Sequence, residues 1–267
     1  MYTNAKMEYQ MYPRSLALAE IAWSPAKKKN FTDFARRVDA NSVRLDERHV
    51  RYHIPLPEQP YGSCDKVVIT KDTVVTFQTS RPMKMVYTLD GTTPTPASAV
   101  YTEPIKVSGN MIIKIATVLP SGTQSKGRTI AVEKPNYAPA ENVSVTKAGL
   151  QLRRINGNYL KVNQLDFADA EWQDCGTVTN LNKMKVSQPD DAATLRGANN
   201  YGAIAEGFIN VPEDGVYYLS SRMEQVWIDN KLMINNEGAV KAGTNSDNAV
   251  ALAKGLHPVK FVYLCNI

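Results

Sequence analysis

The sequence contains few of the residues that build metal centres or disulfide frameworks. Only three of its 267 residues are histidine, which excludes a His-rich metal site. The three cysteines, Cys64, Cys175 and Cys265, are an odd number and lie far apart, so they predict neither a disulfide framework nor a zinc site. We therefore expect no metal and no cofactor.

Long apolar runs and targeting signals are missing too. No stretch reaches the roughly 18 apolar residues that a membrane span needs. The first six residues place no apolar segment after a basic one, so no signal peptide is visible. The net charge of +5 is mild, and its excess lies around Lys27-Lys28-Lys29 and Arg36-Arg37. Nucleic-acid binding favours a basic stripe with stacking aromatics, so we interpret this cluster as a solvated helix face.

What is present divides the chain into five segments. Residues 1–53 are helical in pattern, residues 54–65 form a Pro-rich connector, residues 66–134 are β-rich, residues 135–147 form a linker, and residues 148–267 are again β-rich. The expected fold class is mainly β, with two small β-sandwich modules in tandem after the helices. Because the last predicted strand runs almost to the final residue, we expect the second module to be truncated.

Residues 4–50 show the period of helix faces. The first apolar stripe consists of Met7, Met11, Leu18, Ile21 and Ala22. Pro13 predicts a break or a new helix start, Ser24-Pro25 another start, and Asn30 a cap with Asp33 three residues on. A second stripe consists of Phe31, Phe34 and Val38. A segment of this length cannot bury enough surface to fold alone, so it must pack either on the rest of this chain or on something missing from it.

Short β-branched runs separated by turn residues predict the strands. In the first module they are residues 67–70, 73–77, 85–88 and 111–117. In the second they are residues 207–211, 216–219, 226–228, 232–234 and 259–264. Asp229-Asn230-Lys231 predicts a hairpin turn, whereas the prolines of residues 54–60 predict an extended, unpacked connector.

Candidate catalytic residues are few. The adjacent acidic pairs are Asp46-Glu47, Asp190-Asp191 and Glu213-Asp214, and each is better explained as solvated surface or turn. No nucleophile elbow, Walker loop or dinucleotide fingerprint occurs. We interpret Cys175 as an inert loop thiol and His257 as a turn residue. No catalytic, cofactor-binding or metal-binding residue is therefore predicted.

Aromatic side chains could instead stack on sugars. Trp23 is predicted to be core, Trp172 is the best exposed candidate although core packing is favoured, and Trp227 could face either side of its strand. In the first module Phe77 and Tyr87 have the spacing of core residues, with Met85 and Leu89 on the Tyr87 face. Only Tyr61 and Tyr101 are then left for stacking there.

The helical segment carries a specific resemblance. Pro13-Arg14, followed by Ala17-Leu18-Ala19-Glu20 and Trp23-Ser24, closely resembles the last helix of the catalytic (β/α)8 barrel in glycoside hydrolase family 20, the β-N-acetylhexosaminidases. The likeness covers roughly residues 1–57. Residues 87–96 and 101–105 are similar to the C-terminal β-sandwich of chitobiases and hexosaminidases.

Residues from about 148 resemble, more weakly, a protective-antigen-type β-sandwich. The likeness rests on residues 207–218 and 227–231. Sugar-binding members of that group hold calcium with an aspartate pair. Because Met223-Glu224-Gln225 stands where an acidic loop would be expected, neither calcium nor sugar binding is carried over.

The family's catalytic pair is an Asp-Glu in the middle of the barrel. The Glu protonates the glycosidic oxygen, and the Asp orients the 2-acetamido group of the substrate. This chain has no Gly-Gly-Asp-Glu and no Leu-Trp-x-Glu motif. The resemblance thus implies an inactive C-terminal fragment of a bacterial enzyme that removes terminal N-acetylhexosamine from glycans.

The same resemblance implies a periplasmic, extracellular or cell-surface location, with the missing barrel packed on residues 4–50. The alternative is a non-catalytic, glycan-binding or adhesin-like protein of two sandwiches. The helical prefix discriminates between the two, because such a protein has no use for an amphipathic barrel helix.

Overall fold

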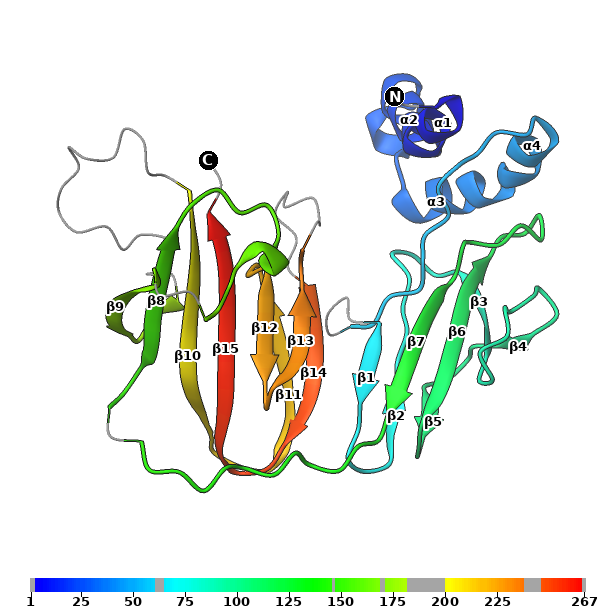
Figure 1. Cartoon of the computed structure of the whole chain (residues 1–267). Coiled ribbons are helices and arrows are strands. Elements are labelled where there is room, and N and C mark those ends of the chain that lie inside the picture. The colour runs from blue at the N-terminus through cyan, green and yellow to red at the C-terminus, as the bar shows by residue number, and fades with distance from the viewer. Residues whose placement is uncertain are drawn as a thin grey trace. The chain divides into compact units, whose positions relative to one another are not determined.

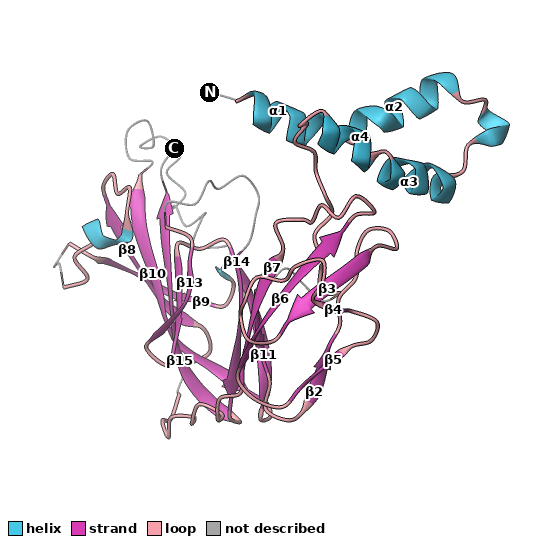
Figure 2. Ribbon diagram, turned by 90° about the vertical axis from the view of Figure 1, so that its right-hand side faces the viewer, coloured by secondary structure: helices cyan, strands magenta, loops and turns pink. Residues whose placement is uncertain are grey.

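The computed structural model describes residues 3–60, 65–145, 147–168, 171–181, 200–237 and 246–265. The chain forms two compact units: Met1–Val67 with Lys71–Lys134, and Val68–Thr70 with Pro135–Ile267. The fold is mainly β, as predicted (Figure 1). Figure 2 shows the helices in cyan and the strands in magenta.

The helical segment contains α1 (Asn4–Met11), α2 (Arg14–Trp23), the 3-10 helix η1 (Ala26–Lys28), α3 (Phe31–Ala40) and α4 (Ser42–Glu47). Pro13 separates α1 from α2, as predicted. The Asn30 side chain caps α3, accepting a hydrogen bond of 3.0 Å from the Asp33 backbone N–H. Ser24-Pro25 precedes only the short η1, because the next α-helix starts at the Asn30 cap.

The connector after the helices is extended, but the prediction that it is unpacked is wrong. Ile54 is buried, and the carbonyl of Pro55 accepts a 2.7 Å hydrogen bond from the Thr117 hydroxyl. Glu58 and Gln78 exchange two backbone hydrogen bonds of 2.8 Å. The prolines keep the chain extended, which leaves its carbonyls available to donors of the sandwich.

The first module has a five-stranded sheet in the order β1-β7-β6-β3-β4 and a two-stranded sheet of β2 and β5. The bounds are β1 (Lys66–Val68), β2 (Thr73–Val75), β3 (Lys84–Thr88), β4 (Ala99–Val100), β5 (Ile105–Val107), β6 (Met111–Val118) and β7 (Arg128–Glu133). Val75 and Phe77 are buried on one face, as predicted, whereas Leu89 is 44% exposed because it lies just beyond β3.

Polar contacts join the helices to this module. The Arg81 guanidinium donates to both carboxylate oxygens of Asp39, at 2.5 and 3.3 Å, and each side chain is only 16% exposed. The Thr123 hydroxyl donates to Asp46 at 2.7 Å. Since Asp39 and Asp46 belong to α3 and α4, it is these helices that are fixed to the sandwich.

The second unit has a six-stranded sheet in the order β13-β12-β15-β10-β8-β9 and a two-stranded sheet of β11 and β14. The bounds are β8 (Leu150–Asn156), β9 (Gln173–Val178), β10 (Tyr201–Val211), β11 (Gly215–Ser221), β12 (Gln225–Ile228), β13 (Lys231–Asn235), β14 (Ser246–Leu252) and β15 (Gly255–Cys265), with the 3-10 helix η2 (Val162–Gln164) after β8. Asp229 and Asn230 have φ of 50° and 58°, which confirms the predicted hairpin.

The two faces of the six-stranded sheet differ. Val226 and Ile228 are buried in clusters that include Leu219 and Leu252 of the two-stranded sheet. Alternation along a strand puts Trp227 on the opposite face, where it pairs with Lys260 across the ladder. We call this second surface the outer face.

Candidate functional site

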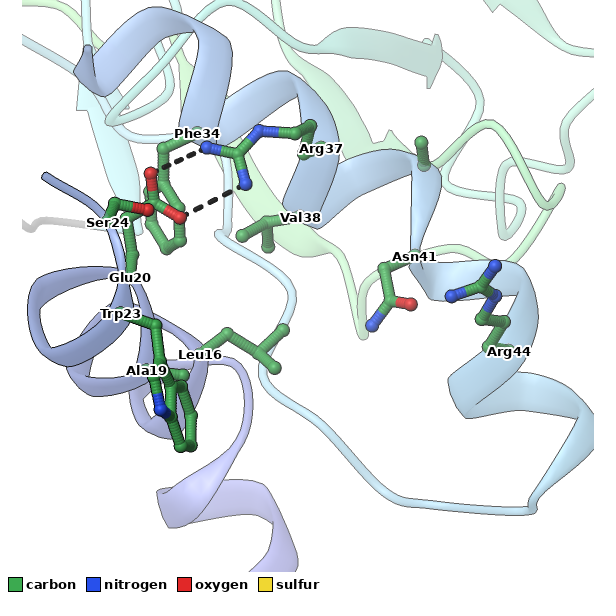
Figure 3. Close-up of a pocket in the computed structure, with 11 residues that line it drawn as sticks. Leu16, Ala19, Glu20, Trp23, Ser24, Phe34, Arg37, Val38, Asn41 and Arg44 are labelled. Carbon is green, nitrogen blue, oxygen red and sulfur yellow. Dashed lines mark hydrogen bonds and ion pairs between the residues drawn. The ribbon is translucent and has the colours of Figure 1, made fainter. Parts of the chain in front are cut away.

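A groove of about 570 Å³ lies within the helical segment (Figure 3). Its apolar lining comes from α2 and α3 and consists of Leu16, Ala19, Trp23, Phe34, Val38 and Ala40. Asn41 and Arg44 line its other end. The groove thus combines a largely apolar wall with one polar end, which suits a protein surface better than a small polar substrate.

Glu20 joins α2 to α3 at the edge of this groove. Its carboxylate accepts two hydrogen bonds from the Arg37 guanidinium, at 2.7 and 3.1 Å, and the Arg37 Nε donates to Asp33 at 2.8 Å. The hydrogen bond from Arg37 is the main cause that lowers the pKa of Glu20, with a smaller contribution from the Ser24 hydroxyl. Glu20 of the Glu-x-x-Trp-Ser pattern thus joins α2 to α3. A carboxyl group with a lowered pKa is a poor general acid.

Several apolar side chains of the helices stay exposed, among them Trp23 of the groove lining. The exposed fractions are 51% for Met7, 49% for Met11, 70% for Leu18, 63% for Ile21, 82% for Trp23 and 70% for Phe31. We call these six residues the helical apolar surface. The prediction that Trp23 is core is wrong for the described chain, because none of the described residues covers that side of α2.

The acidic pairs have different surroundings. Asp46 is partly buried: burial raises its pKa, but hydrogen bonds from Thr123, Ser121 and Tyr52 together outweigh burial and lower it. The interpretation as solvated surface therefore fails for Asp46, while Glu47 is exposed. Asp214 lies in the predicted turn and accepts a 2.7 Å hydrogen bond from the Lys254 backbone N–H. Asp190-Asp191 lies outside the described residues.

Cys175 and His257 both lie in strands, which corrects two predictions. Cys175 belongs to β9, where burial raises the pKa of its thiol and so disfavours the reactive thiolate. His257 is fully buried in β15. Its Nδ1 lies 3.0 Å from both carboxylate oxygens of Asp229, and its Nε2 lies 2.9 Å from the Ala253 carbonyl. The contact with Asp229 links β15 to the β12–β13 hairpin, and the contact with Ala253 links it to the turn after β14.

The candidate stacking residues are mostly engaged in packing. Tyr101 lies edge-on to Phe77 and Tyr87, with ring centroids 5.9 and 6.4 Å away, and its hydroxyl accepts a hydrogen bond from the Phe77 backbone N–H. Trp172 packs against a buried cluster and donates to the Asp166 carbonyl at 2.7 Å. Trp227 is partly exposed on the outer face. Tyr61 lies outside the described residues.

Glu224, which stands where an acidic loop would be expected, has a structural role. Glu224 is only 2% exposed, and its carboxylate accepts a 2.8 Å hydrogen bond from the Leu264 backbone N–H. Among the described residues, no group of three or more His, Cys, Asp and Glu side chains is placed to hold a metal ion. Within the same residues, no helix has the length and apolar character to cross a membrane.

Comparison with known proteins adds matches to family models and to a relative. Residues 67–129 match the chitobiase/β-hexosaminidase C-terminal domain, and residues 176–265 match the PA14 domain. A β-hexosaminidase of Porphyromonas gingivalis is 42% identical over 99% of this chain. The chain is similar to the C-terminal part of a β-hexosaminidase. It spans about a third (34%) of the length of that relative.

Among the solved structures that match this chain are two anti-sigma factor domain-containing proteins, one of them from Clostridium clariflavum, and both are 15% identical to this chain. The first aligns over 62% of this chain and 52% of its own with a TM-score of 0.33, and the second over 75% and 72% with a TM-score of 0.31. At such low TM-scores the likeness carries no argument.

Proposed function

We propose that this chain is the C-terminal part of a secreted bacterial β-N-acetylhexosaminidase. The parent enzyme would hydrolyse terminal, non-reducing N-acetylhexosamine residues of glycans in the periplasm, at the cell surface or outside the cell. The observation that carries this proposal is the 42% identity to a β-hexosaminidase over 99% of the chain. An adhesin of two sandwiches does not account for that similarity in residues 1–53.

The division of labour follows from the segments. Residues 1–53 would be the last helices of a catalytic barrel, residues 66–134 a chitobiase-type sandwich, and residues 148–267 a PA14-type sandwich. The helical apolar surface supports the first assignment, because a patch of this kind marks a surface that normally packs against protein. The missing barrel is the partner that we propose for it.

The chain alone is proposed to be inactive. General-acid catalysis contributes about 10²–10⁴ in rate, and the carboxyl groups of Glu20 and Asp46 both have lowered pKa values. The test is hydrolysis of a chromogenic N-acetylglucosaminide by the chain and by a longer polypeptide that includes the upstream barrel. We expect turnover from the longer polypeptide alone. The proposal would be contradicted if the chain alone turned over the substrate and a single substitution abolished that turnover. The substitutions to test are Asp46→Asn, Glu47→Gln, Asp190→Asn and Asp191→Asn.

Packing of the helices on a barrel has its own test. Deleting residues 1–53 removes the helical apolar surface but keeps the Pro55 carbonyl that Thr117 binds. We expect the shortened chain to be more soluble and to keep a cooperative melt. The double substitution Leu18→Glu, Ile21→Glu is a matched change in the full chain, and it should improve solubility in the same way. Loss of the cooperative melt on deletion would show that the helices belong to the core of the sandwich.

A further inference from the structure

His53 lies where the helical segment is joined to the first sandwich, within the first unit. Its backbone N–H donates a 3.0 Å hydrogen bond to the carbonyl of Tyr12, the residue that ends α1. The next two residues, Ile54 and Pro55, are buried, and the Pro55 carbonyl accepts the hydrogen bond from Thr117. His53 thus stands between a contact with α1 and a contact with the sandwich.

The connector holds α1 through residues 51–53. The Arg51 backbone N–H donates to the Glu8 carboxylate at 3.1 Å. The Tyr9 ring meets the His53 imidazole edge to face, with centroids 5.2 Å apart and ring planes at 71°. The His53 imidazole is therefore part of the packing between α1 and the connector, and a change in its charge acts directly on that packing.

The charged groups that act on this imidazole are cationic. They are the guanidinium groups of Arg14, at the start of α2, and of Arg81, between β2 and β3. Burial, and after it the charges of Arg14 and Arg81, lowers the pKa of His53. The joint is thus built around the neutral form of the imidazole.

The carboxylates of the surrounding elements are engaged with other groups. Glu8 of α1 accepts from the Arg51 backbone N–H, and Asp39 of α3 is held by both nitrogens of the Arg81 guanidinium. Among the described residues, no carboxylate acts on His53 in a way that raises its pKa. A proton on the imidazole would therefore add a third positive charge to a site that is already cationic.

We propose that His53 is a pH sensor at this joint: when the imidazole takes up a proton, α1 and α2 loosen from the connector while the sandwich stays folded. The neutral ring packs against Tyr9 without electrostatic cost, whereas the imidazolium is repelled by both guanidinium groups. Because the pKa in the packed state is below the ordinary value of about 6.5, the contribution of His53 is complete above that value and is lost as the pH falls below it.

The competing explanation is that His53 only fills space beside Tyr9. Histidine is the side chain whose ordinary pKa lies between about pH 5 and 8, whereas carboxyl groups titrate near 4. Of the other two histidines, His49 is exposed and His257 belongs to the second unit. If the ring only fills space, mild acid should act on the joint in the same way with or without the imidazole, so substitution of His53 separates the explanations.

The experiment uses the full chain and amide hydrogen exchange followed by NMR at about pH 7.5 and about pH 5.5. Protection factors remove the intrinsic effect of pH on exchange. We expect the protection of the α1 and α2 amides to fall at least about threefold at the lower pH, since one pKa unit corresponds to a factor of ten. The fully buried Ile113 and Ile115 in β6 are internal controls and should keep their protection. The imidazole C–H signals give the titration midpoint of His53, which should lie below about 6.5.

Three variants complete the test. His53→Gln should abolish the fall in protection, and His49→Gln, at an exposed position of the same helical segment, is the matched control that should behave as the wild type. Arg14→Gln should raise the His53 midpoint, because it removes one of the two cations.

The proposal is overturned if α1 and α2 are equally protected at both pH values in the wild type, or if their protection falls equally in His53→Gln. If His53→Gln leaves these helices unprotected at both pH values, Arg14→Gln decides, and an unchanged His53 midpoint in that variant would overturn the proposal. The result does not depend on the proposed function, because no catalytic barrel is needed for it.

Discussion

The buried contact between His257 and Asp229 makes a strong prediction about the second unit. We consider the substitution His257→Leu, which keeps an apolar side chain in the core but removes both ring nitrogens. Both ring nitrogens face acceptors, the Asp229 carboxylate and the Ala253 carbonyl, and a ring with one N–H donates to one of them at a time. A hydrogen bond to a charged group contributes about 1.5–3 kcal/mol, and an acceptor left without its donor adds to the loss. The expected loss in the free energy of unfolding is therefore about 3 kcal/mol.

A loss of about 3 kcal/mol lowers the melting temperature of a domain of this size by roughly 10 °C. The assay is thermal unfolding followed by the fluorescence of Trp172 and Trp227, with Trp23 replaced by Phe in every protein so that only the second unit reports. Tyr218→Leu, at a side chain that is 67% exposed on β11, is the control and should shift the melt little.

A double-mutant cycle then isolates the contact itself. Asp229→Asn keeps a residue that tolerates the φ of 50° at this position. If the two side chains are coupled, the double variant should be less destabilised than the sum of the single variants, by about 1 kcal/mol or more. A His257→Leu melt within about 2 °C of the wild type, or strict additivity in the cycle, would refute the reasoning.

Three further predictions concern other contacts. Arg81→Ala should lower the free energy of unfolding by about 1–3 kcal/mol, because it leaves the partly buried Asp39 without its partner. Limited proteolysis should then release the helices faster than in the control variant Lys84→Ala, which changes an exposed residue. Asp46 has a lowered pKa in the folded chain, so its stabilising contribution is complete above its ordinary pKa near 4 and is lost as the pH falls below that value. Melts at pH 6 and pH 3 should thus differ less in Asp46→Asn than in the wild type, and an equal difference would contradict this. At Gly149, φ is +105° and an added Cβ would lie 2.7 Å from Thr177 and 2.8 Å from the Val178 carbonyl; Gly149→Ala should therefore lower the melt more than Gly122→Ala, where φ is +87° and the space is open.

Most strands could be predicted from local pattern, because β-branched runs and turn residues act over short distances. Strand β15 shows where that logic fails. The pair His257-Pro258 suggested a turn, since proline is rare in central strands. In the structure the Pro258 carbonyl accepts a 3.0 Å hydrogen bond from the Asp229 backbone N–H. Asp229 lies just after the last residue of β12. The missing N–H of Pro258 therefore breaks no ladder bond with β12. That tolerance depends on a hairpin some thirty residues earlier.

The surroundings of Trp227 on the outer face could not be predicted from the sequence, for a related reason. Alternation placed Trp227 opposite Val226 and Ile228, but it could not tell which face is covered. The answer depends on the packing of β11 and β14 against the six-stranded sheet. Phe167 and Lys260 meet only because the segment after β8 returns over that sheet. Trp23 was misjudged for the opposite reason: the amphipathic pattern of α2 predicts a covered face, but it does not say which chain covers it.

The position of β15 in its sheet also affects how the second unit is made on the ribosome. β15 lies between β12 and β10, although it follows every other strand of that sheet in the sequence. Until it emerges from the exit tunnel, β12 with β13 and β10 with β8 are two separate pieces, each with an unpaired edge. Such edges and long-range pairings favour slow folding and aggregation of nascent chains. Production of this unit is therefore expected to benefit from slow synthesis or from chaperones that shield strand edges until the central strand is available.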